Sequence, residues 1–140
     1  MRTLHFGLRV ADPQRSLAFY AALGYEPVGS VPGTSMGDLT MIKLPGDAFV
    51  TIELVSGSSA HPPGLGGGLS HFVIKVESMA RVLEELAAAG ITPDERPGSP
   101  DGSDEFWTAW ITDPDGNRIE LVQWPRGHAD GLSAADWPDG

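Results

Sequence analysis

The sequence predicts an α+β fold made of two tandem βαβββ modules that together form a curved mixed sheet. The tetrapeptide Ile-Glu-Leu-Val occurs twice, at 52–55 and at 119–122. The segments His5–Val10 and His71–Val76 share a second pattern, which starts with His-Phe and ends with a basic residue and valine. The two copies of each pattern are separated by nearly the same distance in the chain, which indicates a duplicated structural unit.

Each predicted module begins with a strand and continues into a helix. Residues 3–10 and 70–76 alternate between two faces, as half-buried strands do. Asp12 and Ser78 have the short polar side chains that favour helix N-caps, and Pro13 suits the first helical position. A strand followed by a capped helix is therefore expected at the start of both modules.

The helices are expected to end at Gly24 and Gly90, because glycine commonly follows the last helical turn. Apolar residues recur at helical spacing in both helices. Three strands complete each module, at 25–28, 39–44 and 50–55 in the first and at 92–96, 106–112 and 118–124 in the second. The predicted order is therefore βαβββ, twice.

The two modules are predicted to make up one domain, residues 1–124. The first module covers about 1–55 and the second 69–124, and the connector 56–68 is rich in glycine, serine and proline. The tail, residues 125–140, is predicted to be loosely ordered. A lid that folds over a site is the other role that the sequence leaves open for this tail.

The amino-acid composition of the chain argues against several classes of function. A formal net charge of −10 argues against a nucleic-acid partner, since such proteins carry a basic surface. The chain has no cysteine, so disulfides, thiolate metal ligands and cysteine nucleophiles are excluded. No stretch has the length and apolar character of a membrane span or a secretion leader. A cytoplasmic protein without a membrane partner is expected.

Four polar residues fall on one face of the predicted strands: His5, Glu53, His71 and Glu120. Strand alternation places them opposite the aliphatic residues that pack on the helices. Each module supplies one imidazole and one carboxylate from equivalent positions. This set suits a first-row divalent metal ion and leaves coordination positions open for water or substrate.

These features resemble the vicinal oxygen chelate superfamily, in which paired βαβββ modules carry metal ligands on their first and last strands. The start MRTLHFGLRVADPQRSLAFYAALGY and the end DPDGNRIELV are most similar to the glyoxalase I (lactoylglutathione lyase) family, particularly its short bacterial members. The resemblance runs from Met1 to about Trp124. The ligand order His, Glu, His, Glu is its specific part.

The resemblance implies a metal-binding cleft and a homodimer, in which His5 and Glu53 of one chain share an ion with His71 and Glu120 of the other. Nickel or cobalt is the expected metal, with zinc as the alternative. The implied enzyme is a carbon–sulfur lyase for methylglyoxal detoxification. It isomerises the hemithioacetal of a small-molecule 2-oxoaldehyde and a thiol to a 2-hydroxyacyl thioester through an enediolate.

Individual roles follow from the same resemblance and from the face alternation. Glu120 is the expected catalytic base, and Glu53 takes the mirror role for the other stereoisomer. Arg9 matches the position that holds a glutathione carboxylate in the family. Trp110 is expected to line an apolar substrate pocket beside the metal.

Two positions depart from the glyoxalase I pattern. Residues 56–58 are Ser-Gly-Ser where the family usually has an asparagine, and loop 100–104 carries two aspartates where a basic residue is often found. The identity of the thiol is therefore left open. The alternatives are another enzyme of the superfamily, an epimerase or ring-cleaving dioxygenase, or a metal-free protein that binds a small molecule. His61 and His128 are predicted to be solvated.

Overall fold

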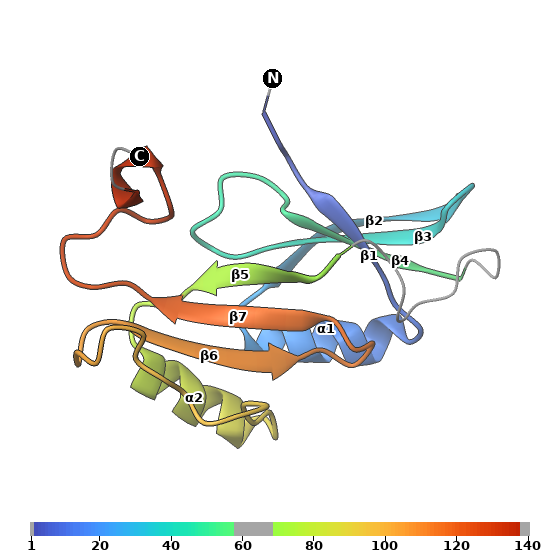
Figure 1. Ribbon diagram of the computed structural model, residues 1–140. Helices are drawn as coiled ribbons and strands as arrows, with labels where there is room; N and C mark the ends of the chain where they lie inside the picture. Colours follow the sequence, from blue (N-terminus) through green and yellow to red (C-terminus); the bar gives the residue numbers. More distant parts are fainter. Residues whose placement is uncertain (1, 58–68, 138–140) are drawn as a thin grey trace. The chain divides into compact units, whose positions relative to one another are not determined.

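The computed structural model describes residues 2–57 and 69–137 (Figure 1). The chain forms two compact units. Unit 1 runs from the N-terminus to the connector and also includes Asp113–Asn117, whereas unit 2 contains Leu69–Thr112 and the chain from Arg118 onward. No helix in the described part is long and apolar enough to span a membrane.

Unit 1 has the predicted βαβββ order. Its elements are β1 (Phe6–Arg9), α1 (Pro13–Ala22), β2 (Glu26–Thr34), β3 (Gly37–Lys43) and β4 (Ile52–Ser56). The strands form a sheet of order β1-β4-β3-β2, in which β1 runs parallel to β4 and the other pairs are antiparallel. The first strand of the unit therefore lies beside its last strand.

Unit 2 repeats this arrangement with one strand fewer. Its elements are β5 (His71–Lys75), α2 (Met79–Ala88), β6 (Trp107–Thr112), β7 (Arg118–Gln123) and the short 3₁₀ helix η1 (Ala134–Asp136). The sheet order is β5-β7-β6, with β5 parallel to β7 and β6 antiparallel to it. The two mixed sheets and two helices confirm the α+β class.

The prediction of a strand at 92–96 is wrong. This segment is irregular, and Asp94 N donates to Trp110 O of β6 at 2.8 Å. Beyond the segment, Gly98 forms an isolated bridge with Thr108. Pro93 lies within the segment and a second proline follows it, and proline cannot donate a ladder hydrogen bond. Unit 2 is therefore βαββ rather than βαβββ.

The predicted helix ends are confirmed. The Asp12 side chain accepts hydrogen bonds from two backbone amides of the first turn of α1, and Ser78 accepts one in α2. Pro13 begins α1. Gly24 and Gly90 follow the helices with φ of +102° and +78°, a left-handed conformation that glycine adopts without the strain of a Cβ atom.

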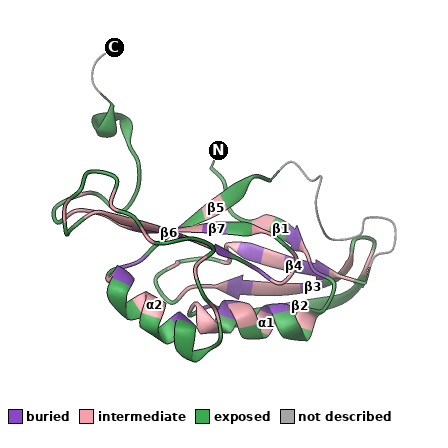
Figure 2. Ribbon diagram, turned by 60° about the horizontal axis from the view of Figure 1, so that its bottom comes forward, coloured by how far each residue is buried: buried purple, intermediate pink, exposed green. Residues whose placement is uncertain are grey.

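The core of each unit lies between its sheet and its helix. In β4, Ile52 and Leu54 are each 1% exposed, whereas Glu53 between them lies on the opposite face. In β7, Ile119 and Leu121 are fully buried in the same pattern. Figure 2 shows this alternation of buried and less buried segments along the strands. The isoleucine and leucine of both IELV copies therefore face the core, as predicted.

Two strand boundaries differ from the prediction by more than two residues. β1 begins at Phe6 rather than at residue 3, because its parallel partner β4 begins at Ile52, which is paired with Phe6. His5 therefore lies just before the strand. β2 extends to Thr34, well past the predicted end at Val28, because it forms a long hairpin with β3 across two register shifts.

The turn Asp113–Asn117 is attached to α1 by buried polar contacts. The Tyr20 hydroxyl donates to Asp113 Oδ2 at 2.6 Å, and both residues are buried. The Ser16 hydroxyl donates to Asp115 Oδ2 at 3.3 Å. Burial, reinforced by the Asp113 charge, raises the pKa of Tyr20, so that its hydroxyl remains a donor.

His128 is not the solvated side chain that the sequence predicted. Its ring stacks on Trp124 with a centroid distance of 4.3 Å and an interplanar angle of 11°. Nε2 lies 2.7 Å from Asp136 Oδ1, and Nδ1 lies 2.7 Å from the carbonyl oxygen of Ala129. The sequence missed these partners because they come from the irregular tail. His61 lies outside the described residues, and the predicted domain limits and loose order of the tail stay predictions.

The contacts of His128 predict a pH-dependent tail. Because both ring nitrogens face oxygen acceptors, the protonated ring is favoured, and the Ala129 carbonyl and the Asp136 carboxylate raise the pKa of His128 above its ordinary 6.5. The tail contacts are therefore strongest below 6.5 and weaken as the pH rises through this raised pKa. An NMR titration of the His128 ring should give a midpoint above 6.5, and Asp136→Asn should lower it. A wild-type midpoint at or below 6.5 contradicts the prediction.

Candidate metal centre

His5 and Glu53 form a pair in unit 1. His5 Nε2 lies 3.2 Å from Glu53 Oε2. Glu53 is paired with Gly7 in the parallel ladder, so His5, two residues before Gly7, falls on the same side of the sheet. The Glu53 side chain is 13% exposed and the His5 side chain 41% exposed. The carboxylate is therefore held at the sheet while the ring is open to solvent.

His71 and Glu120 form the equivalent pair in unit 2. His71 Nε2 lies 3.8 Å from Glu120 Oε2. Glu120 is paired with Val73 in the parallel ladder, and His71 lies two residues before Val73. The register is therefore the same as in unit 1, with each histidine two residues ahead of the residue that faces the glutamate. The duplicated sequence positions occupy duplicated structural positions.

Within each pair, the imidazole nitrogen and the carboxylate oxygen are placed to bind the same divalent ion. Two ligand atoms each about 2.1 Å from one ion, at right angles, are about 3 Å apart. The 3.2 Å separation in the first pair is close to this value, and the 3.8 Å separation in the second needs a small side-chain adjustment. Imidazole nitrogen and carboxylate oxygen are both ordinary ligands of nickel, cobalt and zinc.

Within residues 2–57 and 69–137, no three histidine, aspartate or glutamate side chains gather closely enough to hold a metal ion. The structure thus brings His5 together with Glu53 and His71 together with Glu120, and describes each pair in its own unit. The four-ligand site stays a prediction.

Trp110 lies next to the second pair. It is directly opposite Glu120 in the antiparallel ladder, and its ring meets the His71 ring edge-on with a centroid distance of 5.0 Å. The Arg118 guanidinium lies over the same ring, 4.4 Å from its centroid, and 3.9 Å from Asp94. Trp110 is thus held between a cation and the imidazole, and its predicted role toward substrate stays a prediction.

Arg9 lies on β1, paired with Val55, and is half-buried. Its position four residues after His5 places it on the same side of the strand as the histidine. Among the residues that the structure describes, no carboxylate forms an ion pair with it. Its predicted role in binding a thiol carboxylate stays a prediction.

One neighbour of the site was missed by the sequence reasoning. Met41 of β3 lies opposite Glu53, in the same relation that Trp110 has to Glu120. The register of β3 against β4 depends on the connecting segment 44–51, which is longer than the two-residue loops whose sequence fixes a hairpin register. The sequence repeat could have identified Met41, because the strand before each IELV copy contributes a residue opposite the glutamate.

Known proteins resemble this chain over most of its length. The family model of the Glyoxalase/Bleomycin resistance protein/Dioxygenase superfamily matches residues 2–121. The lactoylglutathione lyase of Salmonella typhimurium is 29% identical over 126 residues, which cover 88% of this chain and 93% of that protein. The probable chloroplastic lactoylglutathione lyase of Arabidopsis thaliana is 30% identical over 125 residues, but this chain spans only 35% of its length.

Solved structures share the fold. A mutant of glyoxalase I from Zea mays superposes with a TM-score of 0.74 at 23% identity, covering 89% of this chain and 45% of that chain. TnmS3, an antibiotic binding protein from Streptomyces sp. CB03234, superposes with a TM-score of 0.67 at 22% identity, covering 89% and 97%. With a family model that matches from the first strand into β7, the chain belongs to the glyoxalase/bleomycin resistance protein/dioxygenase superfamily.

Proposed function

We propose that the protein is a metal-dependent lyase of the glyoxalase I type. Its substrate is the hemithioacetal that forms from a 2-oxoaldehyde and a thiol, and its product is a 2-hydroxyacyl thioester. The observation that carries this proposal is the pair of histidine–glutamate contacts at the same register position in both units. The curated relatives named lactoylglutathione lyase support it further.

The proposed metal site consists of His5, Glu53, His71 and Glu120. Two chains would each supply one pair to a site, so the proposed active form is a homodimer. Nickel or cobalt is proposed ahead of zinc, on the resemblance to short bacterial glyoxalases. When bound, the ion stabilises the negative charge that develops on two neighbouring substrate oxygens.

Glu120 is proposed as the residue that moves the proton. Its carboxylate removes the hydrogen from the carbon that carries sulfur, and the electron pair passes to the neighbouring carbonyl as an enediolate forms. The proton then returns to the neighbouring carbon, and the hydroxyl on the sulfur-bearing carbon becomes the thioester carbonyl. The step is an isomerisation, so it needs no oxidant or reductant. Trp110, opposite Glu120 in the ladder, provides an apolar wall beside this transfer.

The activity can be tested on metal-stripped protein reloaded with nickel, cobalt or zinc. Methylglyoxal is supplied with glutathione, cysteine or cysteamine, which differ in charge, and thioester formation is followed by absorbance. We expect turnover with at least one thiol, a loss of activity of at least about a hundredfold on metal removal, and stronger recovery with nickel or cobalt than with zinc. Absence of turnover with every thiol and every metal contradicts the proposal.

Mixed dimers provide the control for a shared site. His5→Ala and His71→Ala each remove one ligand, so either variant alone should be inactive. If ligands come from two chains, a mixed dimer has one site that contains both intact histidines, and mixing the two variants should restore part of the activity. Recovery of no activity on subunit exchange contradicts the sharing of sites between chains.

A further inference from the structure

The His71 ring of unit 2 is packed against an aromatic side chain from another strand. β7 lies between β5 and β6 in the sheet, so the Trp110 side chain of β6 reaches across β7 to the His71 ring. The two ring centroids are 5.0 Å apart, with an angle of 74° between the ring planes. Edge-on ring contacts are attractive and have a preferred geometry. Trp110 therefore restricts the orientation of the imidazole, whose Nε2 lies 3.8 Å from Glu120 Oε2.

Arg118 holds the Trp110 ring in this place. The central carbon of its guanidinium group lies 4.4 Å from the Trp110 ring centroid. Arg118 is paired with His71 in the parallel ladder and lies two residues before Glu120, on the same side of β7. A guanidinium group binds an aromatic face through both its charge and its flat shape. Arg118 therefore limits the movement of the indole.

The segment before β6 places a carboxylate beside Arg118. Asp94 Oδ2 lies 3.9 Å from Arg118 Nε and accepts a hydrogen bond from the Thr112 hydroxyl at 2.7 Å. Asp94 N donates to the carbonyl oxygen of Trp110 at 2.8 Å. Asp94 is thus attached to β6 through both its backbone and its side chain. The segment 92–96 forms no strand, but it brings a fixed negative charge to the guanidinium.

Unit 1 has a different pair of residues at the equivalent positions. Met41 lies opposite Glu53, where unit 2 has Trp110 opposite Glu120. Thr51 comes directly before the first IELV copy, where unit 2 has Arg118. Neither methionine nor threonine has an aromatic ring or a charge. Unit 1 therefore cannot orient its histidine in this way, although it repeats the histidine–glutamate pair.

We infer that Arg118 is a positioning residue of the candidate metal centre: through Trp110, it fixes the His71 imidazole in the orientation that faces Glu120 before a metal ion binds. The inference rests on the proposed function only for the role of His71 as a metal ligand. A ligand that is already oriented loses less conformational freedom when the ion binds, so the affinity for the ion rises. His71 and Glu120 thus form the more rigid half of the site.

The sign of the effect on metal affinity separates positioning from simple charge. A cation close to the site repels a divalent ion, so charge alone predicts that removal of Arg118 strengthens metal binding. Positioning predicts the opposite, because the imidazole becomes free to leave its place beside Glu120. Arg118→Met removes the guanidinium group but keeps a long, unbranched side chain. It should weaken nickel binding by about three- to fivefold.

A double-mutant cycle tests whether Arg118 acts through Trp110. Nickel affinity is measured by competition with a chelator on the purified protein. Trp110→Leu should weaken nickel binding about tenfold, and Arg118→Met should cause no further weakening in this background. Trp110→Phe keeps an aromatic edge and should stay within about twofold of the wild type. Equal weakening by Arg118→Met in both backgrounds, or tighter binding in the wild-type background, overturns the inference.

Met41→Leu is the matched control for Trp110→Leu, because it makes the same final residue at the equivalent position of unit 1. It removes no aromatic ring and should change nickel affinity by less than about twofold. A loss as large as that of Trp110→Leu would show a general effect of the residue opposite each glutamate. It would therefore overturn the specific role of the Trp110 ring.

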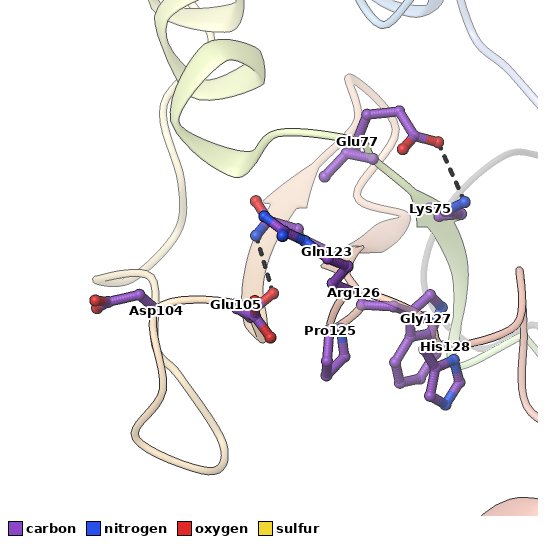
Figure 3. Close-up of a pocket in the computed structure, with 11 residues that line it drawn as sticks. Lys75, Glu77, Asp104, Glu105, Gln123, Pro125, Arg126, Gly127 and His128 are labelled. Carbon is purple, nitrogen blue, oxygen red and sulfur yellow. Dashed lines mark hydrogen bonds and ion pairs between the residues drawn. The ribbon is translucent and has the colours of Figure 1, made fainter.

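Lys75 is the matched control for the charge of Arg118. It lies on the same side of β5 as His71 and lines a cavity of about 500 Å³ in unit 2, which neither His71 nor Trp110 lines (Figure 3). Figure 3 shows Lys75 beside Glu77, and its ammonium nitrogen lies 3.1 Å from Glu77 Oε1. Lys75→Met removes one positive charge without touching the ring contact, so it should not weaken nickel binding. Weakening as large as that of Arg118→Met overturns the inference.

NMR spectroscopy of the metal-free protein tests the orientation of the ring without any ligand. Nuclear Overhauser effects between the ring protons of His71 and Trp110 should be present in the wild type and in Lys75→Met, and should be lost or weakened in Arg118→Met. Unchanged effects in Arg118→Met overturn the inference, whatever the protein catalyses. If the protein neither binds nickel nor turns over a hemithioacetal, the proposed function fails, and this ring contact still decides whether Arg118 orients His71.

Discussion

Replacement of Glu120 by glutamine is expected to lower kcat of the proposed lyase by a factor of about 10²–10⁴, for the stereoisomer of the hemithioacetal that Glu120 serves, while the protein keeps its metal. Glutamine preserves the length of the side chain and one oxygen ligand, but it cannot accept a proton from carbon at neutral pH. The loss should appear in kcat rather than in KM, because the removed function acts during proton transfer and not in substrate binding.

The measurement combines steady-state kinetics with metal analysis of the same preparation. Retained metal with full activity would show that Glu120 is not the catalytic base. Lost metal together with lost activity would show that Glu120 is a ligand. The separation of the two readouts is what distinguishes a catalytic base from a ligand.

Glu53→Gln is the matched control, because Glu53 occupies the repeat-equivalent position and is also paired with a histidine. It removes the same charge from the other unit. If Glu53 takes the mirror role, the control variant should still turn over the stereoisomer of the hemithioacetal that Glu120 serves. With enzyme in excess, a variant that serves one stereoisomer of the hemithioacetal should consume only part of the substrate in its fast phase, so single-turnover kinetics separates the two glutamates. Complete fast consumption by either variant, or no fast phase in both, contradicts distinct roles.

The duplicated parts of the molecule were predictable from the sequence, because local patterns specify them. Alternation along IELV predicted which residues enter the core, and Asp12 and Ser78 predicted the helix starts. The glutamates at equivalent positions then followed from repetition, and the structure places each beside its histidine. Periodicity and capping act over a few residues, so one sequence suffices to read them.

Features that depend on distant partners were not predictable in this way. The segment 92–96 looked like a strand by its place in the repeat, but Pro93 prevents a continuous ladder. The environment of His128 depends on Trp124 and on Asp136, which the irregular tail brings together. No periodic pattern marks such contacts, so a histidine without strand context seemed solvated.

The turn Asp113–Asn117 has one feature that its local sequence specifies and one that depends on a distant partner. Its Asp-Pro-Asp-Gly composition is typical of a tight turn, and Gly116 has the positive φ that such a turn requires. Its attachment to α1 joins Tyr20 to Asp113 across more than ninety residues of chain and has no local signature. This attachment is expected to matter more for stability than the turn itself.

Asp113→Ala is expected to destabilise the protein by about 3 kcal/mol. The Asp113 carboxylate is 4% exposed and accepts hydrogen bonds from the Tyr20 hydroxyl, the Asp115 amide, and both the backbone and side-chain amides of Asn117. Alanine would leave the fully buried Tyr20 hydroxyl and the turn amides without their acceptor. Urea denaturation of wild type and variant measures the difference in the free energy of unfolding.

The control is a double-mutant cycle with Tyr20→Phe. Phenylalanine removes only the hydroxyl and leaves Asp113 its three amide donors, so this variant should cost about 1 kcal/mol. When Asp113→Ala is combined with Tyr20→Phe, it no longer leaves a buried hydroxyl without an acceptor, and its cost should fall by about 1 kcal/mol or more. A cost below about 1 kcal/mol for Asp113→Ala alone, or purely additive effects, contradicts a coupled Tyr20–Asp113 contact.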